Sequence, residues 1–304
     1  MLSSTFIENL GKIVPQANII LNEPMSRHTT FRVGGEAACL IKVPDSERLF
    51  KLIHFLGQTG HDYFLLGNGS NLLVSDSGYN GIILKLEESF EEVQTDGLKI
   101  IAGAAAPLSQ VAKLAMEEGL KGMEFASGIP GTLGGAIVMN AGAYDGEMKQ
   151  IVKEVNVMDR QGNILTLNNE TMEFGYRSSV IRNRPFIVLS AVLSLEEGDK
   201  EEIKQKMKSL AEKRREKQPL EYPSAGSTFK RPEGYFAGKL IMEAGLRGFS
   251  IGGAKVSDKH CGFIVNTGNA TAQDIFEVIQ EVQERVKEQF GVWLEPEVIR
   301  LGEF

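Results

Sequence analysis

The sequence feature that most restricts the fold of this chain is a segment at positions 127–146, SGIPGTLGGAIVMNAGAYDG, in which small residues replace most large side chains. Glycine adopts backbone conformations closed to other residues and lets another molecule approach the main chain. The segment therefore predicts a nearly bare backbone surface, with a short helix at 132–139 whose N-terminal N–H groups face an anion. Alternatively, the glycines only allow this helix to pack closely against its neighbours. The glycines concerned are Gly128, Gly131, Gly134, Gly135 and Gly142.

Another glycine-rich segment, LGNGSNLLVSD at positions 66–76, lies between two apolar stretches. In chain order, positions 66–76 are the first glycine-rich segment and positions 127–146 are the second. A loop of this composition can turn several main-chain N–H groups toward one anionic group, such as a pyrophosphate. The predicted order of strand, loop and strand differs from the dinucleotide fingerprint, in which a helix follows the glycines. A tight hairpin is the alternative reading of this segment. Together the two segments predict FAD, a flat cofactor that carries a pyrophosphate.

Length and charge are those of an ordinary globular protein with a sizeable core. The chain has 304 residues, of which 42% are hydrophobic, and this is enough for two or three lobes. Its formal net charge of -7 disfavours nucleic acid as a partner, because contacts to a phosphate backbone require basic residues. No feature of the sequence marks an obligatory protein partner.

The cysteines and histidines give no sign of a disulfide framework or a metal site. Cys39 and Cys261 lie far apart in the sequence, and the four histidines lack metal-ligand spacing. The N-terminus lacks the basic and apolar regions of a signal peptide, and no stretch approaches the roughly 20 apolar residues of a membrane-spanning helix. We therefore expect a cytoplasmic protein that binds neither a metal nor a membrane.

Hydrophobic periodicity predicts an α+β chain. Residues 1–14 are expected to be helical, and the run TTFRVGGEAACLIKVP is expected to form a strand that ends at Pro44. A helix is expected to run to Glu118 with Pro107 in its first turn, and another to begin after the N-cap Thr271 and end at Gly291. A charged helix before Pro219 places a domain boundary near 197.

Six segments occur in order over nearly the whole chain: TTFRVGGEA, LLGNGSNLLVSD, GIPGTLGGAIVMNAGAYDG, FGYRSSVIR, AGSTFKRP and LEPEV. In these segments the chain resembles the UDP-N-acetylenolpyruvoylglucosamine reductase family, and its compact spacing resembles the shorter, type II form. The resemblance implies the two-lobed FAD-binding fold of para-cresol methylhydroxylase and vanillyl-alcohol oxidase, with a C-terminal α+β substrate-binding domain. The implied lobes are 1–60 and 61–196, and the implied substrate domain is 197–304, with a tail that returns to the active site.

The family resemblance also implies a reaction. NADPH reduces non-covalently bound FAD, and the reduced flavin reduces UDP-N-acetylglucosamine enolpyruvate to UDP-N-acetylmuramate, a step of peptidoglycan precursor synthesis. Hydride from flavin N5 adds to the outer vinyl carbon, and the substrate carboxylate then carries the charge of an enolate-like intermediate.

Three catalytic positions follow from matching motifs. Arg177 in FGYRSS and a protonated Glu297 in LEPEV are expected to stabilise the developing charge, and Ser227 in AGSTFK is expected to donate a proton to the inner carbon. By itself each residue type is more often a surface, capping or solvated residue. The shared motif context is what favours the catalytic interpretation.

Cofactor and substrate contacts are expected in the same motifs. The predicted FAD-binding residues are Gly34, Gly67, Asn68, Gly69, Ser70, Asn71, Leu72, Ser127, Gly128, Ile129, Pro130, Gly131, Thr132, Gly134, Gly135, Asn140, Ala141, Gly142, Ala143 and Tyr144. The predicted substrate-binding residues are Lys217, Gly226, Phe229, Lys230, Arg231 and Lys239. Family members often have asparagine where this chain has Arg231, and some have arginine where it has Ile299, so the contacts to the UDP phosphates are open.

Two other functions are compatible with the same motifs. An FAD-dependent alcohol or sugar oxidase of the same fold would release hydrogen peroxide with simple alcohols. A non-catalytic flavin or UDP-sugar binding module would need none of the three catalytic side chains.

Overall fold

The computed structural model describes residues 2–304, so Met1, with which the predicted N-terminal helix and first lobe begin, lies outside the described residues. The chain forms two compact units that alternate along the sequence. The first unit contains the residues up to Ile20, Cys39–Gly67 and Gly81–Lys213, and the second contains Leu21–Ala38, Asn68–Asn80 and Arg214–Phe304. The division into two FAD-binding lobes and a substrate domain stays a prediction.

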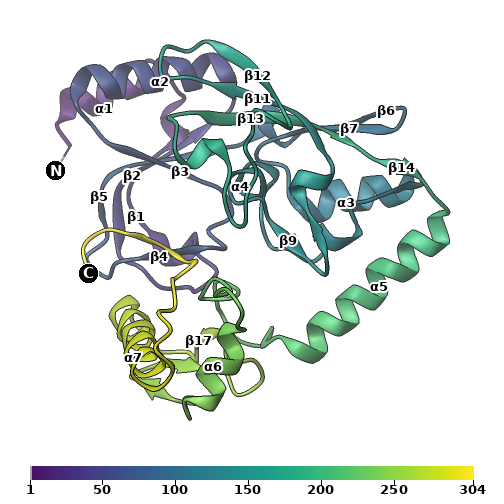
Figure 1. Cartoon of the computed structure of the whole chain (residues 1–304). Helices are drawn as coiled ribbons and strands as arrows, with labels where there is room; N and C mark the ends of the chain where they lie inside the picture. Colours follow the sequence, from purple (N-terminus) through teal and green to yellow (C-terminus); the bar gives the residue numbers. More distant parts are fainter. Residues whose placement is uncertain (1) are drawn as a thin grey trace. The chain divides into compact units, whose positions relative to one another are not determined.

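The helices are α1 (Ser4–Gly11), α2 (Ser46–Thr59), α3 (Leu108–Glu117), α4 (Leu133–Val138), α5 (Lys200–Lys217), α6 (Ala237–Glu243) and α7 (Ala272–Phe290) (Figure 1). The predicted ends of α7 are confirmed: the Thr271 hydroxyl accepts a hydrogen bond from the Asp274 N–H (3.0 Å), and Gly291 is left-handed with φ 70°. Pro107 is not in the first turn of α3 as predicted. It is the N-cap, because its ψ of 133° is extended. Between residues 2 and 304 no helix is both long and apolar enough to span a membrane.

The first unit is built around an antiparallel five-stranded sheet in the order β12-β11-β13-β7-β6. A four-stranded sheet in the order β1-β2-β5-β3 belongs largely to this unit, with β3 parallel to β5. These strands are β1 (Ile19–Pro24), β2 (Glu36–Val43), β3 (Tyr63–Leu66), β5 (Tyr79–Leu86), β6 (Val93–Asp96), β7 (Lys99–Gly103), β11 (Val152–Met158), β12 (Ile164–Asn168) and β13 (Ile187–Ser194). Two short pairs complete the unit: β8 (Leu120–Lys121) with β14 (Glu196–Glu197), and β9 (Gly142–Ala143) with β10 (Gly146–Glu147).

The strand expected in TTFRVGGEAACLIKVP is shorter than predicted, because β2 occupies only Glu36–Val43. The preceding residues do not continue it, since Arg32 and Gly34 have φ values of 58° and 119°. Positive φ is incompatible with an extended strand. The apolar alternation was therefore correct only beyond the glycines.

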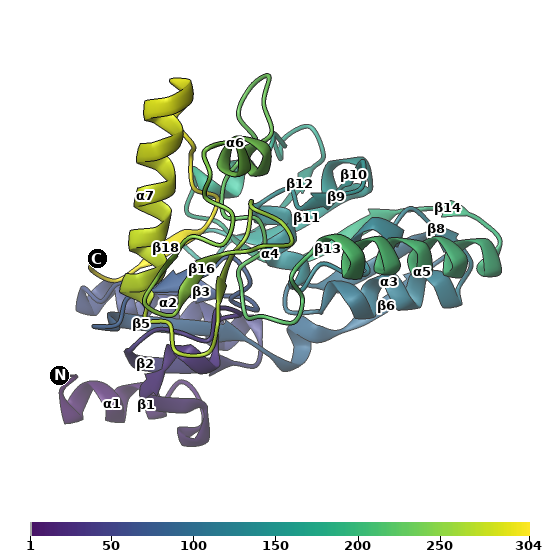
Figure 2. The ribbon, with the colours of Figure 1, turned by 90° about the horizontal axis from the view of Figure 1, so that it is seen from below.

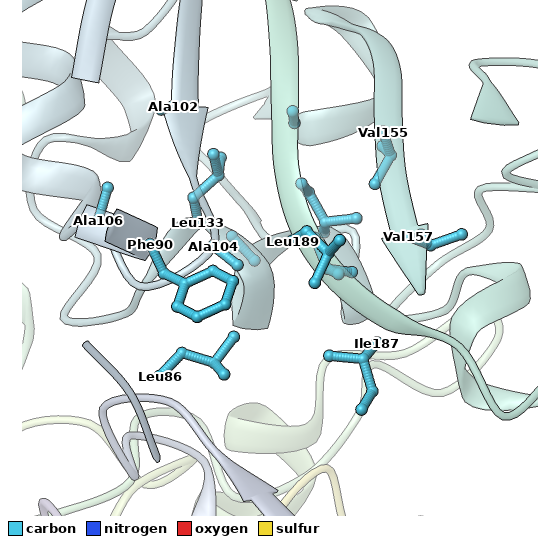
Figure 3. Packing of buried hydrophobic residues seen from close by; sticks show 14 of the residues in the cluster. Leu86, Phe90, Ala102, Ala104, Ala106, Leu133, Val155, Val157, Ile187 and Leu189 are labelled. Atoms are coloured by element: carbon cyan, nitrogen blue, oxygen red, sulfur yellow. The ribbon is translucent and has the colours of Figure 1, made fainter. Parts of the chain in front are cut away.

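The core of the first unit lies between its sheets and helices. Figure 3 shows part of it: Leu86 and Phe90 lie close to Ala104, and Ile187 and Leu189 project from β13. All of these side chains are buried. Burial of a phenylalanine side chain contributes about 2 kcal/mol, so Phe90 is a substantial part of the stability of this core.

The second unit has its own core. A three-stranded antiparallel sheet, made of β15 (Ser250–Ile251), β16 (Ala254–Val256) and β17 (Ile264–Asn266), packs against α7, which is yellow in both views (Figure 1, Figure 2). In the same unit β18 (Ile299–Leu301) pairs in parallel with β4 (Leu72–Val74). The end of the chain is therefore held beside β4, the strand that follows the glycines of LGNGSNLLVSD.

Candidate functional site

The first glycine-rich segment is an open loop and not a hairpin. The strands that flank it, β3 and β4, belong to different sheets, so the hairpin alternative is wrong, whereas the order of strand, loop and strand is confirmed. Gly69 has a φ of 60°, and a Cβ atom there would lie 1.9 Å from the His28 carbonyl oxygen. A side chain at this position would collide with the main chain, so the loop conformation requires glycine.

The second glycine-rich segment contains the predicted short helix, α4, with Thr132 as its N-cap. Both readings of its glycines apply, at different positions. Gly134 is buried, and a Cβ there would lie 3.0 Å from the Ala104 Cβ, so this glycine allows close packing. Gly135 is exposed, and a Cβ atom there would meet only the Thr132 Oγ1, at an ordinary contact distance of 3.5 Å. The helix therefore presents bare backbone on one side.

The two segments meet at Gly67 in the first unit. A Cβ atom on Gly67 would lie 2.8 Å from the Thr132 Oγ1, closer than real Cβ contacts allow. Gly128 and Pro130 are exposed, so the turn before α4 is accessible as well. A flat ligand that carries phosphates fits this surface of bare backbone and exposed turns. The residues present are therefore suited to FAD.

Arg177 lies in a tight turn of the first unit. The Gly175 N–H donates to the Ser178 carbonyl (3.0 Å), and the Ser178 N–H donates to the Gly175 carbonyl (3.2 Å). Arg177, the third residue of the turn, has a φ of 53°, whereas Tyr176 is not among the residues with positive φ. This is the arrangement of a type II turn, in which glycine is preferred at the third position. An arginine in this conformation is strained, and such strain is often found at functional sites.

The turn is attached to the second glycine-rich segment by three hydrogen bonds. The Asn140 Nδ2 donates to the Gly175 carbonyl (3.0 Å), the Ser179 hydroxyl donates to the Val138 carbonyl (2.9 Å), and the Arg177 Nη2 donates to the Gly142 carbonyl (3.3 Å). Asn140 is buried and also donates to Glu147. Its amide therefore orients the arginine turn, and its predicted contact with FAD stays a prediction.

Ser227 and Glu297 come together in the second unit. Phe229 and Pro296 form an antiparallel bridge, and the Glu297 N–H donates to the Thr228 carbonyl (2.8 Å). The two motifs are about 70 positions apart in the sequence, so only folding pairs them. Ser227 is exposed and Glu297 is half-buried. Arg177 belongs to the other unit.

Sequence reasoning missed three residues around Ser227. Thr228 is fully buried, its N–H donates to the Gly262 carbonyl (2.8 Å), and its hydroxyl accepts from the Ile264 N–H (3.1 Å). A Cβ on Gly262 would lie 3.6 Å from the Ser227 Oγ and 3.1 Å from the His260 Nδ1. The imidazole and the serine hydroxyl therefore flank one glycine. The only sequence signal was a glycine at the start of a strand, which is weak.

The orientation of the His260 ring is set by its neighbours. Its Nδ1 accepts a hydrogen bond from the Gly262 N–H (3.1 Å), so the proton of the neutral ring resides on Nε2. Partial burial of the imidazole lowers the pKa of His260. At neutral pH the ring is therefore an uncharged donor beside Ser227.

The predicted substrate-binding cations have neighbours in the second unit. Lys230 forms an ion pair with Glu295, and Lys239 lies 3.7 Å from Glu243. The Arg231 guanidinium lies 3.9 Å from the centroid of the Phe236 ring. Lys217 is exposed in the last turn of α5, Gly226 has a φ of 76°, and the Phe229 ring is buried in the core. Their contacts with a substrate stay predictions.

Comparison with known proteins gives matches along nearly the whole chain. Residues 37–168 match the FAD binding domain, and residues 218–301 match the C-terminal domain of UDP-N-acetylenolpyruvoylglucosamine reductase. UDP-N-acetylenolpyruvoylglucosamine reductase of Caldanaerobacter subterraneus subsp. tengcongensis is 54% identical over 99% of this chain and 100% of the relative, and that of Clostridioides difficile is 50% identical over 97% of each.

A solved structure is similar over almost the same length. The crystal structure of UDP-N-acetylenolpyruvylglucosamine reductase (MurB) from Thermus caldophilus has a TM-score of 0.80 and 37% identity, covering 93% of this chain and 98% of that one. Together with the two domain matches, this confirms the predicted fold class, an α+β FAD-binding fold followed by a C-terminal α+β domain.

Proposed function

This chain belongs to the UDP-N-acetylenolpyruvoylglucosamine reductase family, and we propose that Arg177, Ser227 and Glu297 carry its reaction. It is an FAD-dependent oxidoreductase that reduces UDP-N-acetylglucosamine enolpyruvate to UDP-N-acetylmuramate, with NADPH as the reductant. The observation that carries the residue assignment is the main-chain pairing of the Ser227 and Glu297 segments within the second unit.

FAD, when bound here and reduced by NADPH, would supply the hydride for the outer vinyl carbon of the substrate. As this bond forms, negative charge develops on the substrate carboxylate. The Arg177 guanidinium can donate two hydrogen bonds to that carboxylate, and a protonated Glu297 can donate one more. Each residue is held within its own unit, Arg177 by its turn and Glu297 by its main-chain bond to Thr228, and donors that are held in place before charge develops stabilise it most effectively.

Ser227 completes the reduction by protonating the inner carbon. Its hydroxyl is a weak acid, but a carbanion-like centre is a strong base, so position matters more than acidity. The Ser227 Oγ points toward its own turn, donating to the Phe229 carbonyl at a long 3.3 Å. A bond of this length is easily exchanged for one to a substrate. The serine proton and the hydride together balance the loss of the double bond.

We assign the UDP pyrophosphate to the basic residues Lys217, Lys230, Arg231 and Lys239. Lys230 and Arg231 lie three and four positions after Ser227 in the sequence, which favours a phosphate close to the reacting end of the substrate. We also place the protein in the cytoplasm, where its two buried, unpaired cysteines, Cys39 and Cys261, remain reduced.

The proposed function is tested on the purified protein. We expect a yellow protein whose flavin is released by acid precipitation, and NADPH oxidation that depends on added UDP-N-acetylglucosamine enolpyruvate. Reduced flavin that is not reoxidised by this substrate would contradict the reductase assignment. Hydrogen peroxide formed with simple alcohols would support the oxidase alternative instead.

A Gly262→Ala variant is expected to reduce the UDP-sugar about tenfold more slowly than the wild type, at unchanged FAD content. The new methyl group would lie 3.0 Å from the His260 Cε1, so the imidazole beside Ser227 must move by a few tenths of an ångström, whereas 3.6 Å to the Ser227 Oγ is ordinary van der Waals contact. Small misplacements around a reacting group, even of residues that do not react, are costly. Steady-state kinetics and flavin absorbance measure both quantities. Gly57→Ala, where a Cβ meets no atom within 4 Å, is the control and should retain full activity.

A further inference from the structure

Asn71, the last residue of the first glycine-rich loop, binds the main chain at Glu297. Its Nδ2 donates to the Glu297 carbonyl (3.1 Å), and its own carbonyl accepts a hydrogen bond from the Ile299 N–H (3.0 Å). The parallel ladder of β4 and β18 begins directly afterwards, with Ile299 opposite Leu72. In Figure 1 the yellow C-terminal segment runs alongside β4. The Asn71 amide thus reaches beyond the end of the ladder to the proposed acid.

Both main-chain polar groups of Glu297 are therefore occupied. Its carbonyl accepts from Asn71, and its N–H donates to Thr228, the neighbour of Ser227. The hydrogen bond from Asn71 joins Glu297 to the loop that is assigned to the FAD pyrophosphate. The hydrogen bond to Thr228 joins Glu297 to the residue next to Ser227, the proposed proton donor. Both contacts use main-chain groups of Glu297 and leave the role of its carboxyl group unaffected.

The loop is itself held in one conformation. The Thr30 N–H donates to the Gly69 carbonyl (3.2 Å), and Gly69 has no room for a side chain against His28. At the other end, the Ser75 N–H donates to the Leu301 carbonyl (2.9 Å). Because closely packed groups resist deformation, a rigid loop can fix the position of the Glu297 main chain through the Asn71 hydrogen bond.

We propose that Asn71 is a positioning residue for catalysis, whose amide sets the place of Glu297 relative to the pyrophosphate-binding loop. This inference rests on the proposed function, since it assumes that Glu297 acts on the substrate. Its consequence is a coupling between two sites: the loop that binds the cofactor also orients the acid that acts on the substrate. Loss of the amide donor impairs the step that needs Glu297 more than the step that does not.

Two substitutions test the proposal. Asn71→Ala removes the amide, and Asn71→Asp keeps its size but places an acceptor against the Glu297 carbonyl. Asn18→Ala is the matched control, because the Asn18 Nδ2 also donates to a main-chain carbonyl, that of Lys42, at 3.1 Å. Stopped-flow absorbance at saturating FAD separates flavin reduction by NADPH from flavin reoxidation by the UDP-sugar.

We expect reoxidation to be slowed about tenfold more than flavin reduction in Asn71→Ala, and by a larger ratio in Asn71→Asp. The control should retain both rates. Equal slowing of the two steps, unchanged reoxidation, or failure of both variants to fold would overturn the proposal, because each outcome makes the contact merely structural or irrelevant. A wild-type protein that is not reoxidised by the UDP-sugar would instead reject the proposed function.

Discussion

Replacing Ser227 with alanine is expected to slow reoxidation of the reduced flavin by the UDP-sugar about 10²- to 10⁴-fold, the usual contribution of a positioned proton donor. Reduction of the flavin by NADPH should be unchanged, because that step needs no proton from this hydroxyl. Ser227 is exposed and its intramolecular hydrogen bond is long, so the substitution should leave stability within about 0.5 kcal/mol. Stopped-flow absorbance measures the two steps separately.

The control for this experiment is Ser250→Ala, which removes an exposed hydroxyl from β15 of the same unit. Both rates should be retained in that variant. If Ser227→Ala slows flavin reduction as much as reoxidation, Ser227 has a structural role. If it slows neither, another group supplies the proton and the assignment of Ser227 is wrong.

Replacing Arg177 with glycine is expected to separate activity from stability. The variant loses the guanidinium that is proposed to bind the substrate carboxylate, and reoxidation should slow about 10²- to 10³-fold. Glycine, however, is the preferred residue at a φ of 53° in the third position of this turn. Relief of the left-handed arginine is worth about 1 kcal/mol, which counteracts the loss of the side-chain contacts, among them those to Gly142 and Tyr176. We expect a folded variant whose stability is within about 1 kcal/mol of the wild type.

Urea unfolding and stopped-flow kinetics test both parts of this expectation. Glu173→Gly is the matched control, because Glu173 is exposed and has a φ of 48° but is assigned no role in the reaction. It should gain stability and retain full activity. An Arg177→Gly variant that is inactive because it is unfolded would contradict the expected separation, and one that retains normal reoxidation would remove Arg177 from the mechanism.

Local sequence signals predicted the elements whose ends depend on local chemistry. Thr271 and Gly291 delimit α7 as expected, since capping depends on a hydroxyl and a left-handed glycine within a few residues. The strand before Pro44 was predicted too long, because apolar alternation does not report the positive φ of Arg32. Pro107 is the N-cap of α3, one position before the place that was predicted for it, because a proline fits both positions.

The sequence by itself determined the family, the cofactor and the motifs that contain the proposed catalytic side chains, because each of these is carried by residues close together in the chain. Only the tertiary structure decided how those motifs are held. It paired the chain segments that contain Ser227 and Glu297, placed Gly262 and His260 beside the serine, and bound Asn71 to the main chain of the proposed acid. Such contacts join residues more than 30 positions apart, and their geometry depends on packing that no local pattern encodes.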